Sequence, residues 1–171
     1  MPSGIVHDRI TIVTAAASVP VWWALSASHD PAPLCFVLGS YVFSGFWLSD
    51  DLDTKSTAYK RWGILKWLWL PYRKLVPHRS WLSHGMGIGP MLRAIYFMFM
   101  LWLAAKGVLW LANREGAHFN RDAILENYWH NGLAWTLAHP SYTLWIMTGL
   151  VFGGVVHSVA DGITTFLKKA W

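Results

Sequence analysis

Apolar runs separated by polar segments set the pattern of this chain. The runs without interior charge or with few charges cover residues 10–28, 34–48, 88–111 and 142–160. About 20 apolar residues are enough for a helix to cross a bilayer, although the second run is short for a span. The pattern therefore predicts an all-α fold, with residues 1–171 forming one polytopic membrane domain of four transmembrane helices. The rival interpretation of the first run is a signal peptide, against which His7 and Asp8 stand in the leader.

The segment between the second and third runs mixes basic and aromatic residues. Residues 60–76 are too charged to cross a membrane, and Pro71 is expected to end or bend any helix there. An interfacial amphipathic helix is predicted, with a solvated basic loop as the alternative. Residues 113–141 are polar and predict an extramembrane loop with a short helix. Arg93, inside the third run, is expected to snorkel or to face the bundle interior.

Composition supports the membrane assignment and narrows the partners. Hydrophobic residues make up 54% of the chain and charged residues 13%, against about 25% charged in a typical soluble domain. The 13 tryptophans suit the headgroup level of a bilayer, or a contact with a membrane protein partner or a second copy. The net charge of +5 comes from basic residues that flank apolar runs, so anionic lipid headgroups are expected as the partner and nucleic acid is not. The single cysteine, Cys35, excludes an intrachain disulfide and a cysteine-based zinc site.

Four spans would place the N-terminus, residues 49–85 and the C-terminus on the same side of the membrane. Of the 14 Lys and Arg residues, all but Lys106, Arg114 and Arg121 fall on that side. The positive-inside rule makes it cytoplasmic, so both termini are predicted to be cytoplasmic.

Acidic and histidine side chains recur on that side at every helix end. His157 and Asp161 are four residues apart and share one helix face. Carboxylates and imidazoles together are ligands for divalent metals. Each position alone has an ordinary explanation, such as a surface histidine or a helix stop, but their convergence favours a metal site. The set comprises His7, Asp8, Asp50, Asp51, Asp53, His78, His84, His157 and Asp161. His29, His118, His130 and His139 fall on the other side and are taken as loop residues.

The sequences DLDTKS, RWGILKWLWLPYR and HRSWLSHG resemble a bacterial family of metal-binding membrane proteins. That family's pattern is roughly Ser-Pro-Asp-Leu-Asp, then Trp-Gly, Pro-Tyr-Arg, and His-Arg-Ser followed by Ser-His-Gly. The chain is more distantly similar to membrane-bound metal-dependent hydrolases. Asp50 stands where the family has proline, so it ranks below the other aspartates. The resemblance implies that the metal ligands are Asp51, Asp53, His78, His84, His157 and Asp161, with His7 as a further ligand.

The leading functional hypothesis is a metal-dependent hydrolase that acts on a phosphoester or lipid-like substrate at the cytoplasmic membrane surface. These ligands outnumber the three or four that one zinc ion binds. One or two ions are therefore expected, with zinc as the first choice and manganese or iron as alternatives. Arg79 is the candidate for holding a substrate phosphate, or else it anchors to headgroups. The alternative function is a non-enzymatic membrane protein with a structural metal site that acts as an interaction or assembly partner. A transporter is disfavoured because the ligands lie at helix ends and not at the midplane.

Overall fold

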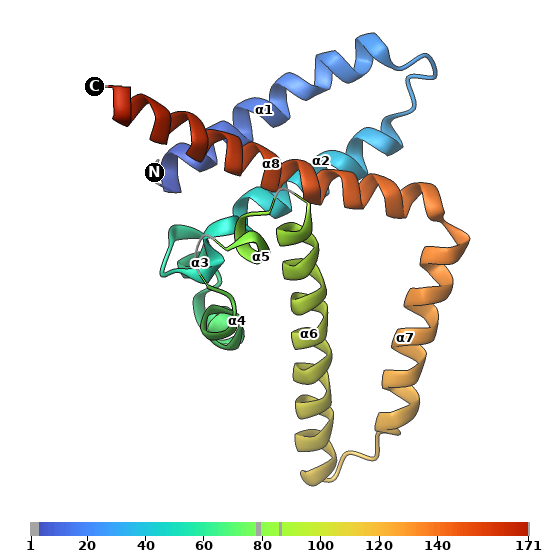
Figure 1. The fold of residues 1–171 in the computed structure, drawn as a ribbon. Coiled ribbons are helices and arrows are strands. Elements are labelled where there is room, and N and C mark those ends of the chain that lie inside the picture. Colours follow the sequence, from blue (N-terminus) through green and yellow to red (C-terminus); the bar gives the residue numbers. More distant parts are fainter. Residues whose placement is uncertain (1–3, 78–79, 86, 171) are drawn as a thin grey trace.

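The computed structural model describes residues 4–77, 80–85 and 87–170, and every regular element in them is helical (Figure 1). The all-α prediction is therefore confirmed. The elements, η denoting a 3-10 helix, are α1 (Gly4–Leu25), α2 (Pro31–Phe46), η1 (Asp50–Asp53), α3 (Thr57–Arg61), η2 (Gly63–Trp69), α4 (Leu70–Leu75), α5 (Trp81–His84), α6 (Ile88–Arg114), α7 (Arg121–Ala138) and α8 (Pro140–Ala170).

Polar caps define where several helices begin. Asp30 accepts a hydrogen bond from the backbone N–H of Ala32, and a proline follows it at the first position of α2. Asn120 caps α7 in the same way through the N–H of Ala123. Such caps satisfy backbone donors that the helix itself leaves unpaired.

Helices α2 and α8 pack side by side, with α1 beside them, and glycines allow the close approach (Figure 1). A Cβ on Gly149 would lie 2.2 Å from the carbonyl oxygen of Val37 in α2. Ser44 of α2 donates to the carbonyl of Leu150 at 2.9 Å. Small residues and hydroxyl contacts of this kind bring helix backbones together without relying on bulky side chains.

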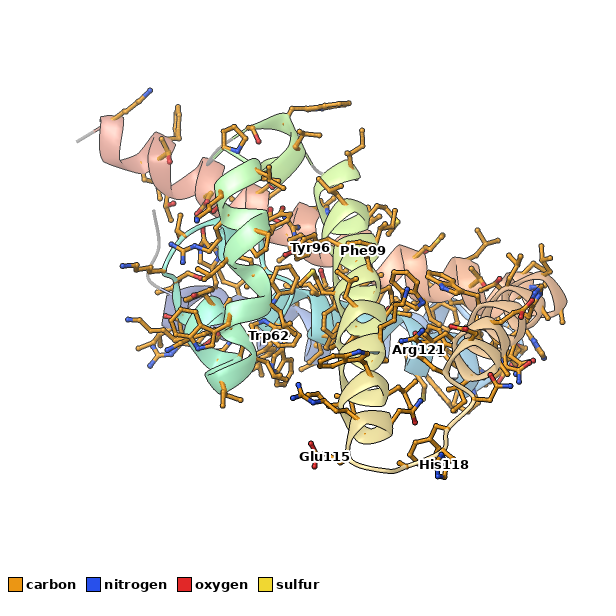
Figure 2. The ribbon with its side chains drawn as sticks, turned by 90° about the horizontal axis from the view of Figure 1, so that it is seen from below. Trp62, Tyr96, Phe99, Glu115, His118 and Arg121 are labelled. Atoms are coloured by element: carbon orange, nitrogen blue, oxygen red, sulfur yellow. The ribbon has the colours of Figure 1, made fainter. Side chains whose placement is uncertain are left out.

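Helix α6 begins against the middle of α8 and extends away from it. Helix α7 then runs back beside α6 toward the start of α8 (Figures 1 and 2). At the crossing, a Cβ on Gly154 of α8 would lie 2.3 Å from the Pro90 ring of α6. The first turns of α1 and the last turns of α8 lie at the same side of the molecule, near η1 and α3 (Figure 1).

Among the described residues, three segments are long and apolar enough to cross a membrane: Pro31–Asp53, Ile88–Arg114 and Pro140–Leu167. The prediction of four spans is wrong in number. Helix α1 (Gly4–Leu25) is not among them, because Asp8 and Arg9 lower the mean hydropathy of its 22 residues. The α6 segment also runs crosswise to the α2–α8 pair, so the three do not form a parallel bundle (Figure 1).

The predicted interfacial helix over residues 60–76 is wrong as a single helix. It is divided among α3, η2 and α4, because Gly63 takes a positive φ of 54° where α3 ends. Pro71 lies in the first turn of α4, and η2 ends at Trp69 two residues before it, in agreement with the expectation that a helix ends there. Trp69 and Tyr72 are buried in a core that also contains Leu48, Leu52, Ala58, Tyr59 and Val76. The other side exposes Ile64, Leu65, Trp67 and Leu75. The segment is thus part core and part apolar surface.

Residues 113–141 also depart from the prediction, because α7 is 18 residues long and takes up most of the expected loop. It exposes large apolar side chains, among them Trp129, Leu133 and Leu137. His130 lies within this helix and His139 at its C-cap, so neither is a simple loop residue.

A buried ion pair joins the elements around the crossing. Arg93 of α6 is fully buried and pairs with Asp50 of η1, whose exposure is 1%. Arg93 also donates to the carbonyl oxygen of Ser83 at 2.6 Å, and Ser158 of α8 donates to Asp50 at 3.1 Å. Arg93 was expected either to snorkel or to face the interior, and it faces the interior. Burial raises the pKa of the nearby Tyr72 phenol, an effect that the Arg93 charge partly offsets, so Tyr72 stays neutral.

We expect Asp50→Ala to lower the free energy of unfolding by about 3–5 kcal/mol, because the Arg93 charge would stay buried without its partner. Circular dichroism of the detergent-solubilised protein during denaturant unfolding measures this. Arg114→Met is the matched control. It removes an exposed charge on α6, the helix that carries Arg93, and is expected to change the free energy of unfolding little. Equal midpoints for Asp50→Ala and wild type would contradict the structural role.

Candidate metal centre

Residues from three elements meet at the side of the molecule where α1 begins. His7 lies in the first turns of α1, Asp51 on η1, and His157 and Asp161 one turn apart on α8. His7 and His157 are 6% and 5% exposed. The contact of α1 with α2 and α8 is what brings the start of the chain to these late residues.

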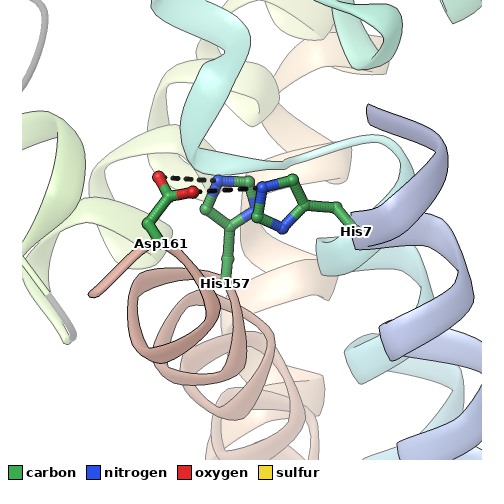
Figure 3. A group of neighbouring side chains, drawn as sticks. All are labelled: His7, His157 and Asp161. Carbon is green, nitrogen blue, oxygen red and sulfur yellow. Dashed lines mark ion pairs between the residues drawn. The ribbon is translucent and has the colours of Figure 1, made fainter. Parts of the chain in front are cut away.

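The side chains of His7, His157 and Asp161 converge on one point (Figure 3). Nε2 of His7 lies 3.2 Å from Oδ1 of Asp161, and Nε2 of His157 lies 3.8 Å from Oδ2. The two imidazole rings stack with centroids 3.8 Å apart and planes 11° from parallel. Asp51 adds a carboxylate oxygen 3.6 Å from Nε2 of His157.

These separations suit a divalent ion between the side chains. Bonds of about 2.0–2.2 Å in a tetrahedral site put neighbouring ligand atoms roughly 3.3–3.6 Å apart. Within the described part of the chain, Nε2 of His7, Nε2 of His157 and Oδ1 of Asp161 are buried without a hydrogen bond. Buried polar atoms without hydrogen bonds are costly, and two stacked imidazolium cations would repel. Neutral imidazoles that share an ion with the carboxylate remove both costs, so the residues fit a metal.

Ser49 sets the orientation of one of these rings. Its hydroxyl lies 3.4 Å from Nδ1 of His157, and both residues are buried. A proton on Nδ1 that is donated to this hydroxyl leaves the Nε2 lone pair directed at the carboxylates. Metal-binding histidines are commonly held by such a contact from the other ring nitrogen. Ser49 was not among the predicted site residues, although it directly precedes the aspartate cluster.

The remaining predicted residues lie elsewhere or outside the described part of the chain. Asp53 is buried on η1, where side chains three apart in a 3-10 helix are eclipsed, so it shares a face with Asp50 and not with Asp51. His78 and Arg79 lie outside the described residues. For His84 only the backbone position is described, at the end of α5, which packs against η1.

A polar pocket of about 270 Å³ opens beside the candidate centre. The pocket is lined by His7, Asp51 and His157 of the candidate centre and also by Lys55, Lys60 and Arg61. Arg61 is held in place by an ion pair with Asp8 and by a 2.9 Å hydrogen bond to the carbonyl oxygen of Phe46. The centre therefore has one side that faces open space.

Fold and site together define a helical protein with segments apolar enough for a membrane and a histidine–carboxylate group suited to a divalent metal. The chain belongs to the family described as "Uncharacterized metal-binding protein (DUF2227)", which matches residues 2–171. It is also similar to an "Uncharacterized protein" of Aquifex aeolicus (strain VF5), 27% identical over 136 residues that cover 75% of this chain and 89% of that protein. No solved structure matches the chain. The predicted membership of a metal-binding family is confirmed.

We expect Ser49→Ala to weaken metal binding by about 10–100-fold, because His157 would lose the contact that fixes its ring and tautomer. Titration of the metal-free protein with zinc against a fluorescent chelator measures the affinity. Ser18→Ala is the matched control, since the Ser18 hydroxyl bonds only to the Thr14 carbonyl of its own helix among the described residues. Equal affinities for Ser49→Ala and wild type would remove Ser49 from the site.

Proposed function

We propose that this protein is a metal-dependent hydrolase that acts on a phosphoester or lipid-like substrate at a membrane surface. The observation that carries the proposal is the pocket beside the histidine–carboxylate centre. Structural metal sites are fully enclosed by protein ligands, whereas catalytic ones keep a position open. Here His7, Asp51 and His157 line both the centre and the pocket, so a substrate in the pocket would reach the ion.

The residues of the site have different roles in this proposal. His7, His157 and Asp161 would hold the ion as three protein ligands and leave its fourth position open toward the pocket. A bound divalent ion supplies Lewis acidity toward a phosphoryl or carbonyl oxygen and makes water more acidic. The Asp51 side chain is 22% exposed, against 5% for His157, so its carboxylate is the one in the group best placed to take a proton from water in the pocket. The stacked histidines are too enclosed for that role.

A membrane location agrees with the surface around the pocket. The exposed apolar side chains Ile64, Leu65 and Trp67 lie beside Lys60 and Lys66, on the segment that follows the pocket wall. Apolar and basic residues together bind an interface that carries anionic lipids. We propose that this surface rests on the bilayer. In this proposal its side is cytoplasmic, because seven of the 14 Lys and Arg residues lie within residues 55–79.

The second candidate function is a structural metal site in a non-enzymatic assembly partner. It is favoured by the origin of the ligands, since an ion held by α1, η1 and α8 would tie together three separate elements. Metal binding would then stabilise the fold directly. The two functions differ in what metal removal does to the fold.

Metal content is the first test. We expect detergent-purified wild type to carry at least one equivalent of zinc, manganese or iron by elemental mass spectrometry, and His157→Ala and Asp161→Ala to lose it. His130→Ala, an exposed histidine on α7, is the matched control and should keep the metal. Two equivalents in wild type would indicate a second ion. No metal after loading would contradict the proposal. Unfolding of the metal-free protein would favour the structural role.

Activity is the second test. Metal-loaded protein is expected to hydrolyse an aryl phosphomonoester or phosphodiester, and Asp51→Asn to slow turnover by about 10²–10⁴-fold through loss of the proton acceptor. Metal content is measured on the same samples, so that loss of the ion is not mistaken for loss of the base. Glu126→Gln, an exposed acid on α7, serves as the control. Turnover in Asp51→Asn equal to wild type would exclude this role for Asp51.

A further inference from the structure

We infer that the pocket beside the metal centre is a binding site for a phosphate group, recognised by Lys55 and Lys60. The inference deepens the proposed function and rests on it, because residues of the candidate centre and the two lysines line the same pocket. It adds Lys55 and Lys60 to Arg79, which lies outside the described residues, as candidates for holding the phosphate.

The charges that line the pocket leave these two lysines uncommitted. Arg61 and Asp8 neutralise each other in their ion pair, and Asp51 faces the centre. Lys55 and Lys60 form no ion pair with any described residue, and both are exposed. The pocket is therefore lined by two ammonium groups that form no ion pair with a described residue and by residues of a candidate divalent-cation site. An anion is the ligand that such a space attracts.

The lysines are placed by elements that are themselves fixed. Lys55 lies two residues after the end of η1, and η1 is tied down by the buried pair of Asp50 with Arg93. Lys60 lies in α3, and the hydroxyl of its N-cap residue Ser56 accepts from the N–H of Tyr59 at 3.2 Å. The α1 backbone closes against α3, since a Cβ on Gly4 would meet the Thr57 hydroxyl at 2.4 Å. The wall is thus a packed part of the fold.

The size and polarity of the pocket narrow the class of anion. Its volume of about 270 Å³ is below the range of about 300–1,000 Å³ that suits drug-sized ligands. Serine and threonine side chains and charged groups line it, and no large aromatic side chain is among the lining residues. A small, highly charged group such as a phosphomonoester fits. One of its oxygens would face the ion and the others the lysines, an arrangement that stabilises charge on a phosphoryl group.

The test is the binding of inorganic phosphate to zinc-loaded protein by isothermal titration calorimetry. We expect the double variant Lys55→Met/Lys60→Met to bind phosphate at least 10-fold more weakly while its zinc content is unchanged. The matched control is Lys66→Met/Lys74→Met, which removes two lysines of the same basic segment that do not line the pocket. Retained zinc with unchanged phosphate affinity in the pocket variant, or an equal loss in the control, would overturn the inference.

Two further arms separate this inference from the proposed function and identify the source of the phosphate. If wild type binds no metal, the proposed function fails, and the same lysine comparison on metal-free protein still decides the phosphate site. To test a lipid source, phosphatidate is added to the protein–detergent micelles at constant detergent concentration, with phosphatidylcholine as the control. Lysine-dependent competition by phosphatidate supports a lipid headgroup as the natural occupant. Lysine-dependent phosphate binding without that competition supports a soluble phosphomonoester.

Discussion

The buried pair of Arg93 with Asp50 is the contact on which the arrangement of the site depends. A fully buried guanidinium requires a carboxylate, and only η1 supplies one to it among the described residues. Because a 3-10 helix has three residues per turn, fixing Asp50 toward α6 turns Asp51 to another side, toward α1 and His157. The same division occurs on α8, where Ser158 bonds to Asp50 and its neighbour His157 joins the metal centre. Residues of the ion-pair contact and residues of the candidate centre thus alternate along both elements.

This alternation explains the different fates of three aspartates that look alike in sequence. Asp50, which stands where the family pattern has proline, is neither solvated nor part of the candidate centre. Asp53 shares its face, and Asp51 alone of the three approaches the histidines. A buried ion pair is a weak source of net stability, but it specifies geometry, since only one orientation of η1 satisfies Arg93. That orientation therefore determines which η1 side chain reaches the candidate site.

Periodicity and hydropathy predicted the parts of the structure that local sequence controls. The helical class and the long helices α6 and α8 follow from apolar runs, and the i, i+4 spacing of His157 and Asp161 places both on one face. Hydropathy could not show that Trp69 packs against Tyr96 and Phe97 inside the protein, since indole rings bury equally well in lipid. The turn at Gly63 and the crosswise path of α6 depend on tertiary contacts. Ser49 and Lys55 lie within the family pattern and Lys60 does not, but none of the three is a residue type that indicates a metal ligand, and only their place beside the candidate centre distinguishes them.

The candidate ligands come from both ends of the chain, and this has a consequence for biogenesis. His7 lies in α1, which is synthesised well before α8, the helix that carries His157 and Asp161. Closing so long a loop is entropically costly and occurs late. An ion that needs all of them is therefore captured only after synthesis has passed Asp161, when α8 has docked on α2. Metal loading at this position would mark the finished fold, and nascent or truncated chains would remain without the ion.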